Sequence, residues 1–365
     1  MNIFVISQHG YGLGHLSRSC AIAEQLTRIP GACVHLFSGG RPSKGISIPR
    51  GVEFIQLPAT EFTQLTGTPS IATRPVDGGA AAAVERQRSE MLLAQFRRLQ
   101  PAAILVEYFP FAPERYGTTL TDLLDEADRA HPRPVIVSSL RTFPSDATCA
   151  TAGDVNKTLR RYFDMVLHHV DRTIVDMSSL GDYFMRATRG VHVESTGFVS
   201  RTRQHLQPVG RTGGLLFTVG GGRDGAPYLR KWLDAATSAG LEQRHPVTVV
   251  CGPFMSDADY KRVKAMANDR ISVHRYLSDA AMLTLIRSCR ALVCMAGYNT
   301  LNEALQYQTP VLAFPRENYP EQIAQVKLFA DSGLILPGAI TAGQAHIARL
   351  IQQLLEFSAR NDLDF

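Results

Sequence analysis

The stretch ALVCMAGYNTLNEAL, residues 291–305, carries the pattern on which the fold assignment rests. The apolar run 292–295 is typical of a buried strand, Gly297 follows it as a turn residue, and residues 299–307 have helical periodicity. A strand, a glycine turn and a helix in this order form the repeating unit of an α/β protein with a parallel sheet. Backbone N–H groups at the start of such a helix favour a bound anion.

The same alternation extends over the whole chain. In the first half we expect strands at 3–7, 33–38, 52–57, 103–108, 135–140 and 173–176, and helices at 15–28, 81–99, 118–130 and 154–169. In the second half we expect strands at 215–219, 247–251, 271–275, 292–295 and 311–314, and helices at 226–239, 257–267, 279–288, 299–307 and 320–332. Segment 60–80 is rich in Thr, Pro and Gly, which predicts a long exposed loop.

The length of 365 residues exceeds what one ordinary hydrophobic core supports. Between Thr196 and Gly214 the sequence loses its periodicity, which indicates an interdomain linker. We therefore predict an α/β protein with two doubly wound Rossmann-like domains, 1–200 and 201–341, that face each other across a ligand cleft. A last amphipathic helix within 342–365 is expected to pack back on the N-terminal domain.

Composition narrows the class of protein. The chain is 45% hydrophobic and 19% charged, which is typical of a globular protein, and its net charge of +5 comes from scattered Lys and Arg residues. No basic run with interleaved aromatics is present in the sequence, so we do not expect a nucleic-acid partner. The six cysteines form no CxxC motif, so neither disulfides nor a structural metal are expected.

The N-terminal sequence predicts where the protein acts. Met1 leads directly into an apolar strand pattern without a signal-peptide pattern, and no apolar stretch has the roughly 18 to 20 residues that a membrane span needs. We therefore expect a cytoplasmic protein with at most peripheral membrane contact, since a mild positive charge is compatible with an acidic surface.

The first candidate site is the motif HGYGLGH, residues 9–15, directly after the first expected strand. Gly10, Gly12 and Gly14 allow a sharp turn and a close approach of the backbone to a ligand. A dinucleotide site is disfavoured, because the third glycine of its fingerprint is replaced by His15 and the second strand ends without an acidic residue.

His15 is the expected catalytic residue. A histidine at the tip of a glycine turn titrates near neutrality, which suits a general base. The alternative interpretation is that it caps the helix or binds substrate without chemistry. His9 is the next candidate for the base, and Glu107 is a further one.

A second glycine loop, Gly220-Gly221-Gly222-Arg223-Asp224-Gly225, opens the C-terminal half. It lacks the Gly-Lys-Ser/Thr ending of a P-loop, so ATP hydrolysis is not indicated. Backbone N–H groups, with Arg223 beside them, would suit a diphosphate.

The third motif continues from 291–305 into TPVLAFP, residues 309–315, and NYPEQIAQ, residues 318–325. By itself Glu303 is explained by a favourable interaction with the helix dipole. Together, however, the three motifs resemble the GT-B glycosyltransferases, and most closely the inverting family that contains the N-acetylglucosaminyltransferase of the peptidoglycan lipid intermediate.

The resemblance implies roles for residues at matching positions. In that family the first glycine loop ends in a histidine, here His15, and a second loop meets the donor diphosphate, here Gly220, Gly221 and Gly222 with Arg223. The helix start Gly297, Tyr298, Asn299 and Thr300 completes the diphosphate cradle, Glu303 binds the ribose, and Glu321 and Gln322 bind the sugar hydroxyls. The chain departs from the family at Met295, where the family often has a polar or basic residue, and at Arg223-Asp224, which replaces the usual Ser-x-Gly phosphate contact.

The resemblance also implies the reaction. We expect an inverting, metal-independent transfer of a hexose or N-acetylhexosamine from a nucleotide diphosphate sugar, with UDP as the expected nucleotide, to an acceptor hydroxyl, with no cofactor. The acceptor, whether a small molecule, a natural product or a lipid-linked sugar, is not indicated. Asp257-x-Asp259 and Asp362-x-Asp364 are expected to be a helix cap and a tail rather than metal sites. The alternatives are a nucleotide-sugar 2-epimerase and a non-catalytic nucleotide-sugar-binding subunit.

Overall fold

The computed structural model describes residues 1–10, 13–42, 46–64, 71–141, 144, 149–175, 180–201, 211 and 213–357. The chain forms two compact units, which divide between Val199 and Ser200, apart from two short loop segments. The expected tail motif Asp362-x-Asp364 lies outside the described residues.

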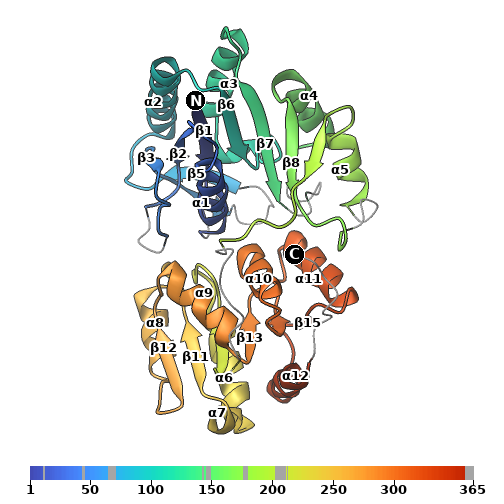
Figure 1. Ribbon diagram of the computed structural model, residues 1–365. Helices are drawn as coiled ribbons and strands as arrows, with labels where there is room; N and C mark the ends of the chain where they lie inside the picture. The colour runs from blue at the N-terminus through green and yellow to red at the C-terminus, as the bar shows by residue number, and fades with distance from the viewer. Residues whose placement is uncertain are drawn as a thin grey trace. The chain divides into compact units, whose positions relative to one another are not determined.

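The first unit is built on a seven-stranded sheet with the order β3-β2-β1-β6-β7-β8-β9, in which every pair is parallel (Figure 1). Its strands are β1 (Asn2–Ser7), β2 (Cys33–Ser38), β3 (Val52–Gln56), β6 (Ala103–Glu107), β7 (Val135–Arg141), β8 (Met165–His169) and β9 (Val193–Ser195). The inner strand β1 has the sequence NIFVIS and is almost entirely buried, as expected for a parallel strand covered on both faces.

Helices connect these strands. They are α1 (Gly14–Leu26), α2 (Ala81–Leu99), the 3₁₀ helix η1 (Pro113–Arg115), α3 (Thr119–Arg129), α4 (Ala152–Tyr162) and α5 (Gly181–Ala187). In Figure 1, α2 and α3 lie next to each other, as do α4 and α5, and both pairs are in contact. The Thr151 hydroxyl accepts a hydrogen bond from the backbone N–H of Asp154 and so begins α4.

Part of segment 60–80 is a hairpin, so the expectation of a loop throughout is wrong. Strands β4 (Thr60–Gln64) and β5 (Ile71–Pro75) pair antiparallel, with Glu61 opposite Arg74. The two side chains form an ion pair of 2.7 Å across the hairpin, and Phe62 is buried beneath it. Opposite charges directly across an antiparallel strand pair stabilise it.

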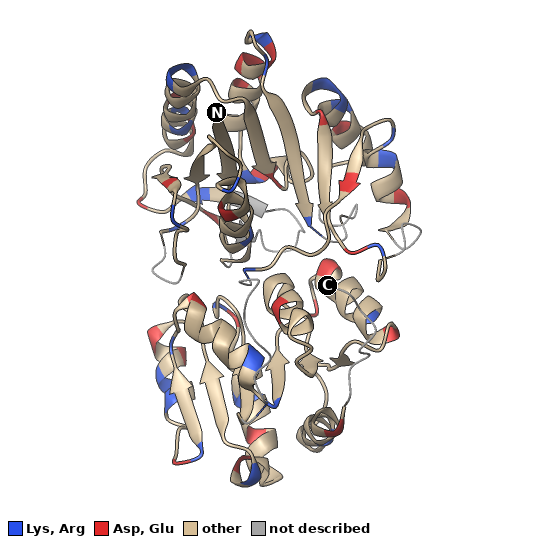
Figure 2. Ribbon diagram, viewed as in Figure 1, with Lys and Arg blue, Asp and Glu red and all other residues tan. Residues whose placement is uncertain are grey.

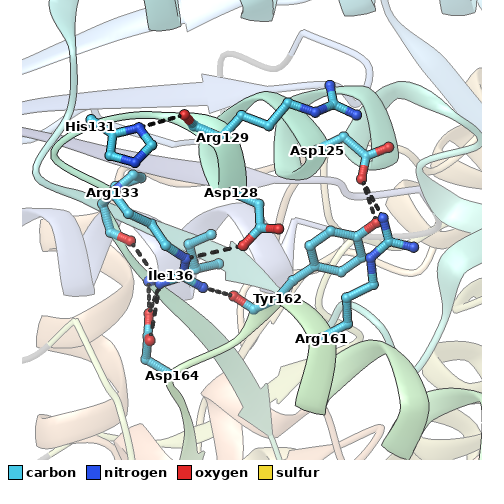
Figure 3. A network of polar contacts seen from close by, with 10 residues as sticks. Asp125, Asp128, Arg129, His131, Arg133, Ile136, Arg161, Tyr162 and Asp164 are labelled. Atoms are coloured by element: carbon cyan, nitrogen blue, oxygen red, sulfur yellow. Dashed lines mark hydrogen bonds and ion pairs between the residues drawn. The ribbon is translucent and has the colours of Figure 1, made fainter.

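The expected helix 154–169 is also too long. Helix α4 ends at Tyr162 and β8 follows it, whereas the expected strand at 173–176 is a turn as far as it is described. Asp164 explains why a strand begins where a helix was expected. Its carboxylate accepts hydrogen bonds from the backbone N–H of Ile136 and from Arg133 (Figure 3). These bonds hold the chain at the start of β8 beside β7.

The second unit contains a six-stranded parallel sheet with the order β12-β11-β10-β13-β14-β15. Its strands are β10 (Leu215–Thr218), β11 (Val247–Val250), β12 (Ile271–His274), β13 (Ala291–Cys294), β14 (Val311–Ala313) and β15 (Leu336–Pro337). Its helices are α6 (Ala226–Ser238), α7 (Leu241–Arg244), α8 (Asp257–Lys264), α9 (Asp279–Ser288), α10 (Tyr298–Gln306), α11 (Pro320–Asp331) and α12 (Gln344–Glu356).

Helix α12 belongs to the core of the second unit. Ile347, Ile351 and Leu354 are fully buried in the same hydrophobic cluster as Trp232, and α12 contacts α6, β13 and β14. The amphipathic face of α12 is thus used in covering the sheet of its own unit. The expectation that the last helix packs back on the N-terminal domain stays a prediction.

Charged residues are dispersed over the helices of both units (Figure 2). Within the described residues, no helix combines the length and the hydropathy that crossing a bilayer requires.

Replacing Ile351 by Ala should lower the free energy of unfolding by about 2–5 kcal/mol, because the change leaves a cavity in a closed core. The matched control is Gln352→Ala on the exposed face of α12, which should change this free energy by less than about 0.5 kcal/mol. Urea denaturation of the two variants measures the difference. Equal effects would contradict the placement of α12.

Candidate active site

The first candidate site lies where β1 and β6 end. The two strands are parallel neighbours, with Ile6 opposite Val106, so the segments that follow them leave the same edge of the sheet. His15 lies in the first turn of α1, and Glu107 is the last residue of β6. His15 Nδ1 and Glu107 Oε1 are 2.5 Å apart, and their side chains are only 12% and 1% exposed. The structure thus joins the expected base to a residue that the sequence offered only as an alternative base.

Arg18 also binds this carboxylate. Its guanidinium forms an ion pair with the same Glu107 oxygen, and both side chains are buried. Arg18 follows His15 by about one turn of α1, so the two side chains lie on the same face of the helix. Sequence reasoning missed Arg18, because an arginine within an amphipathic helix usually lies on the solvated face.

The hydrogen bonds of His15 define its tautomer. Nδ1 donates to the Glu107 carboxylate, and Nε2 accepts from Nη1 of Arg115 at 3.0 Å. Burial lowers the pKa of His15 well below 6.5, and the positive charges of Arg141, Arg115 and Arg18 lower it further. His15 is therefore a neutral imidazole at neutral pH, with the lone pair on Nε2.

His9, the second candidate for the base, has a packing role. It is 1% exposed, and its Nε2 bonds to the carbonyl oxygen of Arg41 at 3.0 Å. Gly10 lies so close to the ring of Phe62 that a Cβ there would approach it to 1.9 Å. Gly14 begins α1, and Gly12 lies outside the described residues.

Tyr108, directly after Glu107, has a left-handed backbone with φ of 59°. Such a conformation costs a non-glycine residue on the order of 1–3 kcal/mol and is concentrated at functional sites. The Tyr108 ring meets the His15 ring edge to face, at 5.9 Å between centroids. The strained turn therefore places an aromatic wall beside His15.

The second candidate site lies at the carboxyl edge of the other sheet. Gly222 has φ of +87°, and a Cβ there would lie 2.1 Å from the carbonyl oxygen of Cys251. Gly220 also has a left-handed backbone, and Gly221 accepts a hydrogen bond from the backbone N–H of Phe254. The loop therefore has a fixed course that requires glycine, and it leads through Gly225 into α6.

The turn before α10 also contains a residue with a left-handed backbone and leads into a helix. Ala296 is fully buried with φ of 54°, and Gly297 precedes the helix without a side chain that could cap it. By contrast, Ser256 and Ser278 cap α8 and α9 with their hydroxyls. The first N–H groups of α10 therefore have no side-chain cap, which suits an anion. Within this turn Tyr298 is buried, and Asn299 and Thr300 are half-buried.

Glu303 is engaged by another side chain. Its carboxylate is 1% exposed, and it accepts from Arg201 Nε at 2.7 Å and from Arg201 Nη2 at 3.2 Å. Arg201 also forms an ion pair with Asp279. A ribose diol at Glu303 would share the carboxylate with Arg201 or displace it. Sequence reasoning missed Arg201, which lies at the start of the unperiodic linker.

Arg316 connects the glycine loop to the segment before α11. It donates to the two oxygens of Asp224 at 2.5 and 2.8 Å, and its backbone N–H donates to Gln322 Oε1 at 3.0 Å. Asp224 is therefore a structural partner in this structure, whereas Arg223 is exposed. Glu321 lies half-buried in the first turn of α11. The expected sugar-binding pair thus begins a helix whose entry is tied to the glycine loop.

Neither site includes a recognisable metal centre: among the residues that the structure describes, no group of three His, Cys, Asp or Glu side chains could hold an ion.

Comparison with known proteins gives few sequence relatives. No family model matches the chain. A protein of Methanosarcina mazei described as an uncharacterized glycosyltransferase is 29% identical over 119 residues, which cover 33% of this chain and 29% of that protein. The match therefore spans less than a third of the relative's own length.

Solved structures match over nearly the whole chain. UGT2 of Phytolacca americana, complexed with UDP-2-fluoro-glucose and pterostilbene, is 15% identical with a TM-score of 0.59, over 97% of this chain and 90% of that one. A UDP-glucosyltransferase from Polygonum tinctorium capable of glucosylating indoxyl is 14% identical with a TM-score of 0.58, over 97% and 89%. MurG of Acinetobacter baumannii is 16% identical with a TM-score of 0.56, over 98% and 93%.

These matches confirm the predicted fold class, two α/β units with parallel sheets. The chain has the fold of the GT-B glycosyltransferases.

Proposed function

We propose that the protein is an inverting, metal-independent glycosyltransferase that moves a hexose or N-acetylhexosamine from a UDP-sugar to an acceptor hydroxyl. The observation that carries the proposal is the hydrogen bond between His15 and Glu107 at the end of β6, in a chain with the GT-B fold. A carboxylate that accepts from Nδ1 leaves the Nε2 lone pair to act as a base.

The chemistry follows from this arrangement. Nε2 of His15 takes the proton of the acceptor hydroxyl as its oxygen attacks the anomeric carbon, and the bond from that carbon to the diphosphate breaks. Attack opposite the leaving group inverts the configuration. Glu107 stabilises the imidazolium that forms, and the nucleoside diphosphate leaves as an anion.

The second unit would bind the donor. Backbone N–H groups of the Gly220-to-Asp224 loop and of the α10 start suit the diphosphate, because both precede helices without side-chain caps. We assign the ribose diol to Glu303 and the sugar hydroxyls to Glu321 and Gln322. The solved structure of UGT2 with UDP-2-fluoro-glucose, which has the same fold, supports a UDP-linked donor.

Product analysis separates the proposal from its alternatives. A nucleotide-sugar 2-epimerase would convert the donor sugar without an acceptor, and a binding subunit would leave the donor unchanged. The proposed transferase releases UDP and forms a new glycoside only when an acceptor is present.

UDP should stabilise the protein without any divalent metal, because the proposed cradle consists of backbone N–H groups. At a UDP concentration of about 100 times its dissociation constant, the gain is roughly 2.7 kcal/mol. Thermal unfolding with UDP is measured in EDTA and in magnesium, with uridine as the control that lacks the diphosphate. Stabilisation that requires magnesium would contradict metal independence.

Glu303→Gln should weaken UDP binding roughly ten- to a hundredfold and remove the preference for UDP over 2′-deoxy-UDP, because the ribose diol loses a charged acceptor. Isothermal titration calorimetry measures both affinities. Asp279→Asn is the matched control, since Asp279 is the other carboxylate paired with Arg201. An equal loss in both variants would show that Glu303 acts through Arg201 rather than on the ribose.

His15→Asn and Glu107→Gln should each lower turnover by about 10²- to 10⁴-fold while UDP affinity stays within about twofold, because they remove the base or the partner that orients it. His131→Asn, an exposed histidine of the same unit, is the control. Sugar transfer is measured under saturating donor. Retention of more than about a tenth of turnover in His15→Asn would exclude His15 as the base.

A further inference from the structure

The nitrogen that would receive the proton is covered by an arginine. Arg115 Nη1 donates to His15 Nε2 at 3.0 Å, so it occupies the lone pair that the acceptor hydroxyl needs. Transfer therefore requires Arg115 to leave Nε2 while remaining close by. An acceptor that offers the guanidinium another partner would free this lone pair.

Arg115 has no carboxylate partner among the described residues. Its guanidinium lies 4.6 Å from the centroid of the Tyr108 ring and 5.4 Å from that of Phe62, and its Nε is buried without an acceptor. Glu114 interacts with it only at a distance. By comparison, Arg41 and Arg74 both form ion pairs with Glu61.

The contacts that hold Arg115 are individually weak. A cation over an aromatic ring is held by a weak electrostatic attraction, whereas a guanidinium that binds a carboxylate or phosphate through two N–H groups forms a stronger, charge-assisted pair. An anion could therefore draw the guanidinium away from His15, and the rings would still keep it beside the base.

Transfer of the proton to His15 creates a positive charge that a nearby anion would stabilise. The imidazolium of His15 would form close to Arg115, Arg141 and Arg18, all of which disfavour its charge. Glu107 opposes them, but it is shared with Arg18. A neutral acceptor leaves this repulsion in place, whereas a negative group on the acceptor offsets it.

We propose that Arg115 is a specificity-determining residue that selects an acceptor bearing a phosphate or carboxylate close to the hydroxyl that receives the sugar. The anion takes the guanidinium, and the hydroxyl takes its place at His15 Nε2. The inference rests on the proposed function for the role of that hydroxyl, but anion binding by Arg115 is measurable without a donor and without turnover.

The test is an NMR titration of the His15 imidazole, assigned by comparison with His15→Asn. Glycerol 3-phosphate and lactate are the anionic probes, and glycerol and 1,2-propanediol are their neutral counterparts, all at the same ionic strength. We expect each anion to raise the pKa of His15 and to shift its Nε2 signal, because a negative charge stabilises the imidazolium. The neutral probes should do neither.

Arg115→Gln should weaken the binding of both anions about tenfold or more, and it should raise the pKa of unliganded His15, because one neighbouring cation is lost. Arg115→Lys keeps the charge and should retain the preference for anions, which guards against a packing defect in the Gln variant. The control is Arg161→Gln, an exposed arginine of the same unit that pairs with Asp125.

Several outcomes would overturn the inference: equal effects of charged and neutral probes, no effect of either anion, or unchanged anion binding in Arg115→Gln. None of them bears on donor binding. UDP affinity and transfer that survive such an outcome would leave the proposed function intact, whereas anion binding without UDP binding would support only the role of Arg115.

Discussion

The buried ion pair between Arg18 and Glu107 is the constraint on which the site of the first unit depends. Removing two charges from water costs several kcal/mol per ion, and their mutual attraction repays this cost only with good geometry and further hydrogen bonds. Here the further bond comes from His15, so the pair and the imidazole form one unit. The sheet fixes Glu107, α1 fixes Arg18, and the orientation of His15 follows from both.

The second unit fixes its candidate site residues in a similar way. Glu303, like Glu107, is a buried glutamate held by an arginine, and Ala296, like Tyr108, is a left-handed non-glycine residue at the end of a central strand. In both units a left-handed residue follows the end of a strand, and the helix or strand next to it carries a buried glutamate that an arginine holds. The two carboxylates differ in their roles. Glu107 orients a neighbouring side chain, whereas Glu303 is the proposed ligand contact.

Much of the architecture could be predicted because it depends on local patterns. Buried parallel strands such as β1 and β13 are continuous apolar runs, and glycine turns mark their ends. The start of β8 could not be predicted in this way, because it depends on bonds from Asp164 to residues far away in sequence. The same holds for the cross-strand ion pair of the β4–β5 hairpin.

The residues of the candidate site also differ in how far the sequence predicts them. The glycine loops and His15 stand out in the sequence because their residue types are unusual at those positions. Arg18, Arg115 and Arg201 do not stand out in the sequence. An arginine is usually solvated, and its tertiary partner cannot be recognised from the sequence alone. The sequence likewise offers Glu107 only as an alternative base. The structure shows instead that Glu107 is the hydrogen-bond partner of His15.

The position of α12 has a consequence for biosynthesis. Ile347, Ile351 and Leu354 help to close the core around Trp232, although more than a hundred residues of chain separate them from α6. Domains generally fold in the order in which the ribosome releases them. The first unit can complete its sheet while translation continues, but the second must wait with an open apolar face until α12 has left the exit tunnel. During that interval the nascent chain exposes apolar surface of the kind that makes a folding intermediate prone to aggregate.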